Sequence, residues 1–138
     1  MTFEEFIETV DKDIDENFIP DYLTSSLLRV CLEYSQFRRR ERKEQALDSL
    51  GNVYYYLSVI AKVCDFQEVT LPPNSNDLLS YMGLMCQVVE DFLYNGIEIK
   101  KDYMDRVISN ILNELEKDCR SLDMTPSEVM KENIERER

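Results

Sequence analysis

The side chains that could do chemistry in this chain are mostly carboxylates. Histidine is absent, which removes the commonest general base and a frequent metal ligand, so catalysis would have to use Asp, Glu, Lys, Tyr or Cys. Asp and Glu number 28 against 16 Lys and Arg, giving a formal net charge of −12. That balance suits holding cations or imitating the phosphates of a nucleic acid. It argues against direct nucleic-acid binding, which depends on clustered Lys and Arg.

The cysteines suggest neither a metal site nor a disulfide framework. Cys31, Cys64, Cys86 and Cys119 are far apart, form no CxxC pair, and each falls on an apolar stripe of an expected helix. We therefore expect buried free thiols in a reducing compartment. No run of about 18 apolar residues and no basic-then-apolar leader occurs, so a cytoplasmic protein without membrane contact is expected.

Helices are the elements that must position these side chains. Only three glycines and four prolines occur in 138 residues, too few turn formers for an all-β domain, whereas an apolar share of 43% is enough for one core. We therefore predict an all-α, single-domain helical bundle. Its expected parts are an acidic N-terminal helix in residues 1–20, a first helical hairpin in 21–69, a linker in 70–77, and a second hairpin with a short terminal helix in 78–138.

Apolar residues at helical spacing set the helices within these parts. Thr2 and Glu5 form a capping box for the first helix, whose apolar face reaches Val10 and Ile14. A second capping box opens the last helix at "TPSE", residues 125–128. The helices between them are expected at about 21–39, 43–65, 78–94 and 100–122.

The helix expected at 43–65 contains the stretch "LDSLGNVYYYLSVIAKV". It is apolar over much of its circumference and should therefore be central. Gly51 and Asn52 interrupt it against helix propensity. We expect Gly51 to be the small residue that lets a facing helix approach closely.

The two hairpins read as an internal repeat. "SLLRVCLEYSQF" aligns with "GLMCQVVEDFLY", which pairs Glu33 with Glu90, and "SLGNVYYYL" aligns with "VISNILNEL", which pairs Asn52 with Asn110. The separations agree within one residue, at 19 and 20. Two hairpins of one design, packed about a pseudo-twofold axis, would give a four-helix core.

These segments resemble the MazG-like all-α NTP pyrophosphohydrolases, relatives of the dimeric dUTPases. "LGNVYYYLSVIAKVCDF" looks like the family's "LGDVLWYL" helix, "GLMCQVVED" resembles its "GLAGEAGEV" helix, and "LDMTPSEVMKENIERER" resembles its closing segment. The resemblance implies Mg²⁺ held by Glu-x-x-Glu and Glu-x-x-Asp pairs on neighbouring helices, and release of pyrophosphate from a nucleoside triphosphate. It also allows a homodimer, although two hairpins in one chain make part of that bundle internal.

The resemblance also assigns site positions. Its metal positions are Val30, Glu33, Ser49 and Asn52 in the first hairpin, and Gln87, Glu90, Val107 and Asn110 in the second. One acid in four remains in each, so Glu33, Asn52, Glu90 and Asn110 are the candidate Mg²⁺ ligands, in a site that should be weak. The closing segment gives Lys131, Asn133 and Arg136 as candidate nucleotide contacts. Nucleotide binding with weakened or lost hydrolysis is the expected function.

Nearby acids and the N-terminal segment leave two alternatives open. A rearranged metal site could use Asp48 and Glu114 with Glu33 and Glu90, although all four acids also read as ordinary surface residues. Residues 1–21 carry eight acids against one lysine, an array that could imitate nucleic acid. The alternative function is therefore a non-enzymatic acidic interaction protein, such as an inhibitor that blocks a nucleic-acid-binding partner.

Overall fold

The computed structural model describes residues 1–10, 14–72 and 76–137, and this part of the chain is all-α, as predicted. Helices α2 and α3 form one hairpin and α4 and α5 form a second, which confirms the predicted pair of hairpins. None of the helices in the described ranges is long and apolar enough to cross a membrane. The elements in chain order are α1 (Phe3–Glu8), the short 3-10 helix η1 (Glu16–Phe18), α2 (Ile19–Arg39), α3 (Lys43–Val63), α4 (Leu78–Asn95), α5 (Lys101–Ser121) and α6 (Pro126–Glu137).

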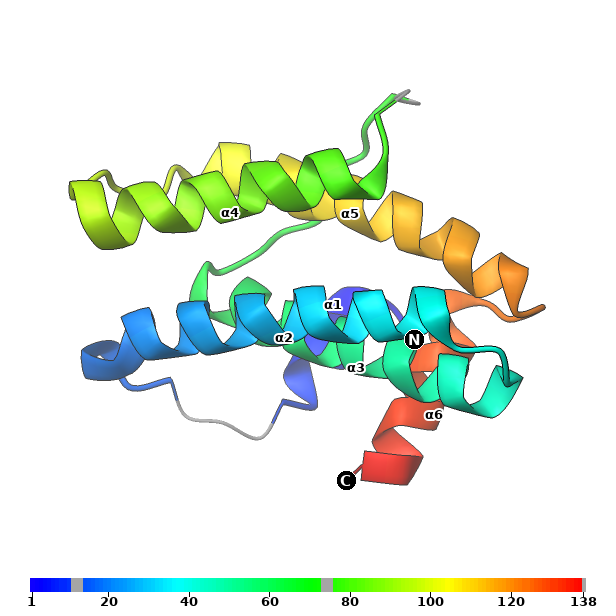
Figure 1. The fold of residues 1–138 in the computed structure, drawn as a ribbon. Helices are drawn as coiled ribbons and strands as arrows, with labels where there is room; N and C mark the ends of the chain where they lie inside the picture. The colour runs from blue at the N-terminus through cyan, green and yellow to red at the C-terminus, as the bar shows by residue number, and fades with distance from the viewer. Residues whose placement is uncertain (11–13, 73–75, 138) are drawn as a thin grey trace.

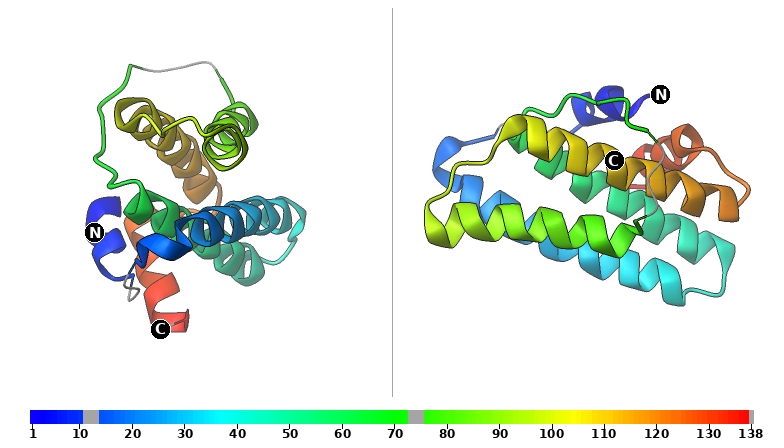
Figure 2. Two further views of the ribbon diagram at one scale, coloured as in Figure 1. Left: turned by 90° about the vertical axis from the view of Figure 1, so that its left-hand side faces the viewer. Right: turned by 90° about the horizontal axis from the view of Figure 1, so that it is seen from above.

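The two hairpins form two layers. Figure 1 shows α4 and α5 above α2 and α3, and the end-on view of Figure 2 shows α6 extending from the α2–α3 layer away from α4 and α5. Between the layers, the Tyr34 hydroxyl of α2 donates to Asp118 Oδ2 of α5 at 3.0 Å. The Tyr54 hydroxyl of α3 lies 3.4 Å from Cys119 Sγ of α5. Polar contacts therefore link both helices of the lower layer to α5.

Helix α3 is the central helix, as its apolar circumference predicted. It packs against α2, α1 and α6. Leu50, Leu57 and Ile60 are fully buried, and so is Tyr54 apart from 1% of its surface. Residues on more than one face of α3 are therefore buried. The helix can be buried in this way because it carries few charged residues beyond its first turns.

Helix α1 is shorter than the predicted N-terminal helix. The capping box of Thr2 and Glu5 is present, but the helix ends at Glu8. The Thr9 hydroxyl donates to the Phe6 carbonyl, and Lys62 Nζ donates to the Val10 carbonyl at 2.9 Å. The second bond attaches the chain beyond α1 to α3. Residues 11–13, which the prediction also included, lie outside the described residues.

The connection between the hairpins is held along α5 before the chain turns into α4. The backbone N–H of Gln67 donates to Asp105 Oδ1 at 3.2 Å, and that of Val69 donates to Ser109 Oγ at 3.0 Å. Asp105 and Ser109 are both buried polar residues one turn apart on α5. They accept from the backbone of a segment that is itself exposed at Gln67 and partly buried at Val69, and so fix its path along α5.

Helix α6 is capped as predicted and packs back onto α3. The Glu128 N–H donates to Thr125 Oγ1, and the Thr125 N–H donates to Glu128 Oε1, which is the reciprocal pair of a capping box. Val129 and Met130 are buried. The C-terminal segment of the second hairpin is thereby anchored on the first hairpin, at Gly51 of α3.

Candidate functional site

The candidate site lies where α6 crosses α3. Gly51 has no side chain there, and a Cβ added to it would lie 3.1 Å from Cβ of Asn133, closer than most such contacts. Asn133 is 4% exposed, and its Nδ2 donates to Oδ1 of Asn52 at 3.2 Å. Gly51 therefore does let a facing helix approach closely, and that helix is α6.

An ion pair lies beside this contact. Arg136 of α6 binds Asp48 of α3 and, on its own helix, Glu132 at 3.2 Å. The pKa of the Arg136 guanidinium is raised above its ordinary value by the hydrogen bond to Asp48. The crevice at this junction is too narrow for a water molecule, and its walls are Leu47, Asp48, Gly51, Glu132, Asn133 and Arg136.

Glu33, the acid among the candidate Mg²⁺ ligands of the first hairpin, is paired with an arginine. Glu33 is 5% exposed, and its Oε1 accepts from Arg29 Nη2 at 3.0 Å within α2. The Arg29 guanidinium carbon lies 5.1 Å from the ring centre of Tyr56 on α3, within the range of a cation–π contact. The negative charge of Glu33 is therefore balanced by Arg29 of the same helix.

These positions do not fit a Mg²⁺ ion in the observed arrangement. Magnesium needs several oxygen ligands in near-octahedral geometry, whereas Glu33 is directed to Arg29 and the Asn52 oxygen already accepts from Asn133. Within the described ranges, no three Cys, Asp or Glu side chains are grouped so that they could hold a metal ion. Binding of Mg²⁺ to this chain stays a prediction.

The other candidate residues lie elsewhere. Glu90 is exposed on α4, while Asn110 of α5 lines a cavity between α4 and α5 that Glu90 does not line. Lys131 is exposed on α6, and its charge contributes to lowering the pKa of Glu5 on α1 behind the larger effect of the Thr2 hydrogen bonds. Of the predicted set, Asn52 and Asn133 are in direct contact, with Arg136 bound to the adjacent turn of α3.

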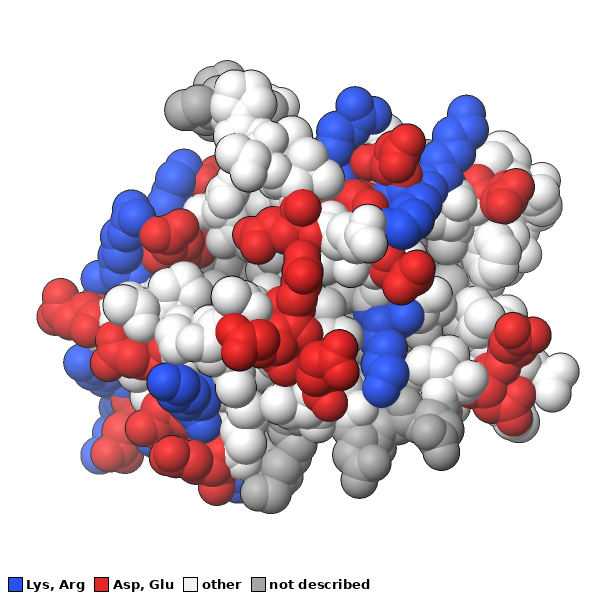
Figure 3. All heavy atoms as spheres, turned by 180° about the vertical axis from the view of Figure 1, so that it is seen from behind, with Lys and Arg blue, Asp and Glu red and all other residues white. Residues whose placement is uncertain are grey.

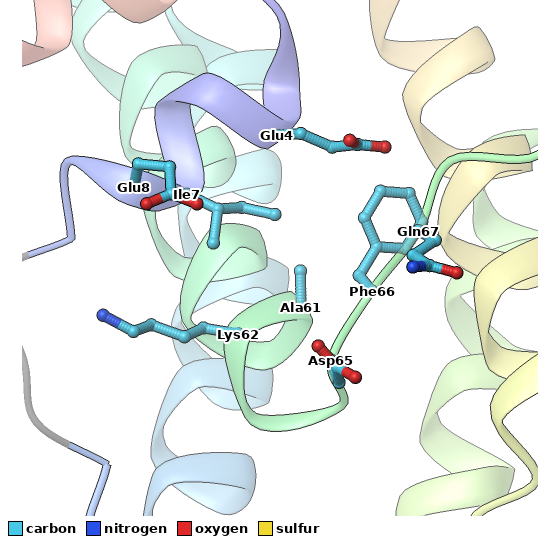
Figure 4. A pocket seen from close by; sticks show the side chains of 8 residues that line it. All are labelled: Glu4, Ile7, Glu8, Ala61, Lys62, Asp65, Phe66 and Gln67. Carbon is cyan, nitrogen blue, oxygen red and sulfur yellow. The ribbon is translucent and has the colours of Figure 1, made fainter.

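A second surface feature is an acidic hollow between α1 and the end of α3. Its volume is about 330 Å³, and Figure 4 shows the carboxylates of Glu4, Glu8 and Asp65 around it. Lys62 also lines it, but its ammonium group donates to the Val10 carbonyl. The hollow is floored by the apolar side chains of Ile7, Ala61 and Phe66.

Sequence reasoning missed Arg29 and the pairing of Asp48 with Arg136. The signal for Arg29 was present, because a basic residue four positions before Glu33 lies on the same helix face. No local pattern links Asp48 to Arg136, since these residues are 88 apart in the chain. Their contact depends on how α6 returns to α3.

No protein-family model, curated protein or solved structure matches this chain.

Proposed function

We propose that this chain is a MazG-like helical domain that binds a nucleoside phosphate at the α3–α6 junction, with metal-dependent hydrolysis weakened or lost. The observation that carries the proposal is the hydrogen bond from Asn133 to Asn52. These asparagines belong to two separate motifs of the resemblance and are 81 residues apart. If the likeness of each motif to the family were due to chance, there would be no reason for the two motifs to be in contact in the folded chain.

Arg136 is the residue best suited to bind a phosphate at this junction. Its side chain is 35% exposed and that of Asp48 is 45% exposed, so their ion pair contributes little free energy in water. A phosphate offers a guanidinium two charged oxygens in the bidentate geometry that it prefers. The ligand would therefore displace Asp48 from Arg136 and open the crevice beside Asn133.

The weakening of hydrolysis follows from the chemistry of the α2–α3 face. Glu33 is bound to Arg29, and the remaining positions of the first hairpin are Val30, Ser49 and Asn52. Valine offers no ligand, and an amide or hydroxyl oxygen is a weaker ligand for a hard cation than a carboxylate. Binding without rapid turnover is the chemistry that these side chains support.

A nucleotide panel tests this proposal. Purified protein is heated with each dNTP and NTP, with and without Mg²⁺ or Mn²⁺, and released pyrophosphate is assayed in parallel. At least one triphosphate should raise the melting temperature, with little or no pyrophosphate formed. Arg136→Gln should abolish the shift, whereas Arg106→Gln, at an exposed arginine of α5, should retain it. The absence of any shift and of any turnover would remove the proposal.

The acidic hollow favours a second candidate function, a non-enzymatic contact with a basic partner. Acidic side chains gather in the middle of the face shown in Figure 3, and Glu4, Glu8 and Asp65 surround the hollow. Carboxylates over an apolar floor suit the ammonium or guanidinium end of a partner's side chain, because its stem can pack on the floor. A nucleic-acid-binding protein presents such side chains on its surface.

Competition distinguishes this second candidate. A complex with a nucleic-acid-binding protein should be displaced by DNA or RNA and weakened by Glu8→Lys, because Glu8 is an exposed lining residue of the hollow. Glu135→Lys, at an exposed acid of α6, is the matched control for the change in net charge. A complex that nucleic acid does not displace would count against mimicry.

A further inference from the structure

Two cysteines from different hairpins are neighbours at the boundary between α2 and α4. These helices pack against each other, and Figure 1 shows them one above the other with their chains running in opposite directions. Cys31 lies near the middle of α2 and Cys86 near the middle of α4, so antiparallel packing brings them together. Burial raises the pKa of the Cys31 thiol, and the Cys86 thiol beside it raises it further. The two thiols therefore interact directly across the boundary between the hairpins.

Both thiols are free and can be reached from solvent. All four cysteines of the chain lie in the described ranges and are free thiols, and Cys31 and Cys86 are both partly exposed. The α2–α4 boundary itself opens to the surface beside them, since Leu32 of α2 is 42% exposed and Leu84 of α4 is 40% exposed. A small oxidant can therefore approach this pair in the folded protein.

The other two cysteines provide a contrast within the same chain. Cys119 is fully buried, and its sulfur lies 3.4 Å from the Tyr54 hydroxyl. Cys64 lies near Asp105 and Lys101, whose charges affect its pKa behind the larger effect of burial. Burial raises the pKa of Cys64 to about 12 and that of Cys119 to about 11. Thiols held protonated in this way are poor nucleophiles, so we expect neither to react readily with an oxidant.

We propose that Cys31 and Cys86 are a modification site, at which a peroxide converts the two thiols into a reversible disulfide that joins the two hairpins. Each hairpin contributes one sulfur atom, so the bond links α2 to α4 covalently. In a reducing compartment the pair returns to free thiols. The inference does not rest on the nucleoside phosphate proposed for the α3–α6 junction.

The reaction balances with hydrogen peroxide as the oxidant. The first thiol attacks a peroxide oxygen, the O–O bond breaks, and a sulfenic acid and one water form. The second thiol attacks the sulfenic sulfur, the S–S bond forms, and the hydroxyl leaves with the thiol proton as a second water. The sulfur atoms are oxidised and the peroxide oxygens are reduced. Because burial raises the pKa of Cys31, we expect Cys86 to react first and Cys31 to attack the sulfenic acid.

The disulfide should stabilise the fold. It would close a loop over residues 32–85, which include the whole of α3, Lys43–Val63. Cross-linking residues that are far apart in sequence reduces the conformational freedom of the unfolded chain. We therefore expect the oxidised protein to melt at a higher temperature than the reduced protein.

The test treats the purified full chain with hydrogen peroxide, blocks the remaining thiols with iodoacetamide, and digests it with a protease that cuts after acidic residues. Acidic residues separate the four cysteines in the sequence, so mass spectrometry of the peptides identifies each pairing. Before blocking, the intact monomer should lose the mass of two hydrogen atoms. A linked pair of peptides containing Cys31 and Cys86 should appear, and dithiothreitol should remove it.

Matched variants separate this pair from the other cysteines. Cys31→Ser and Cys86→Ser should lose both the linked peptides and the rise in melting temperature, whereas Cys64→Ser should keep both. If serine at either position prevents folding, the peptide map of the parent decides alone. The proposal is overturned if the oxidised parent contains no linked Cys31–Cys86 peptides, if its cysteines pair only between chains, or if its melting temperature does not rise.

Discussion

At the scale of single residues, two acids on the α2–α3 hairpin are paired with arginines of the same chain. Glu33 is bound to Arg29, and Asp48 is bound to Arg136. The two pairs differ in burial, because the Glu33 side chain is 7% exposed while that of Asp48 is 45% exposed. The first pair should therefore act in stability and the second in exchangeable binding.

Removing Arg29 should destabilise the protein by leaving Glu33 buried without a counter-charge. The side chain of Arg29 is itself 43% exposed, so we expect a loss of about 2 kcal/mol, below the range for a fully buried pair. Urea unfolding of Arg29→Ala, followed by circular dichroism, measures this. Combining it with Glu33→Gln should recover much of the loss. A double variant as unstable as the sum of the two single variants would contradict a direct coupling.

Asp118 should make stability depend on pH. Burial raises the pKa of its carboxyl above the ordinary value of 3.8, against the lowering effect of the hydrogen bond from Tyr34. The folded protein thus binds this proton more tightly than the unfolded chain, so the stabilisation is present below pH 3.8 and is lost as pH rises through the folded-state pKa. Asp118→Asn keeps an acceptor for Tyr34 without the charge.

This variant should melt higher than the parent at pH 7, and the difference should shrink as the pH falls toward 3.8. Differential scanning calorimetry across that window provides the measurement. A variant that melts lower at pH 7 would mean that the charge of Asp118 stabilises the fold, which is the opposite of the burial effect.

At the scale of elements, the close crossing of α3 and α6 is the feature that joins the two hairpins at the candidate site. Gly51 allows it, and Asn133 occupies the space that a side chain would fill. Gly83 of α4 provides a contrast, because a Cβ added there would meet nothing within 4 Å. The two glycines are both helical, but only Gly51 has a packing reason.

Alanine substitution at the two glycines should separate helix propensity from packing. Gly83→Ala should stabilise the protein by about 0.5–1 kcal/mol through propensity alone. Gly51→Ala should gain less or destabilise, because its methyl group requires Asn133 to move. Urea midpoints of both variants test this. An equal gain in stability at the two positions would show that α6 can move away from α3 at no cost in free energy.

The helices were largely predictable from sequence, and the contacts between them were not. The helix expected at about 43–65 is found at Lys43–Val63, because apolar spacing and capping are local properties. The predicted end of the first helix was wrong: α1 ends at Glu8, and the residues that follow are bound to α3 through Lys62 and Val10, a contact that the local sequence does not indicate. The site was predictable only as a set of positions. That Asn52 meets Asn133 while Glu90 and Asn110 lie elsewhere depends on how the hairpins pack.

At the scale of the whole molecule, the charge imbalance opposes compactness. The chain carries 28 acids against 16 basic residues, and repulsion among like charges is relieved when salt screens them. We therefore expect the melting temperature to rise by several degrees between low salt and physiological ionic strength. Calorimetry in sodium chloride measures this change. A fall in melting temperature would mean that the surface ion pairs outweigh the net repulsion.

In the function proposed above, two distant parts of the chain form one nucleoside phosphate site at the α3–α6 junction. The most direct test is a ¹⁵N-resolved NMR titration with a nucleoside triphosphate, following the side-chain amide signals of Asn52 and Asn133. Both signals should shift together and saturate, and Arg136→Gln should abolish the response. Unchanged signals at Asn52 and Asn133 at saturating triphosphate would instead count against a site at this junction.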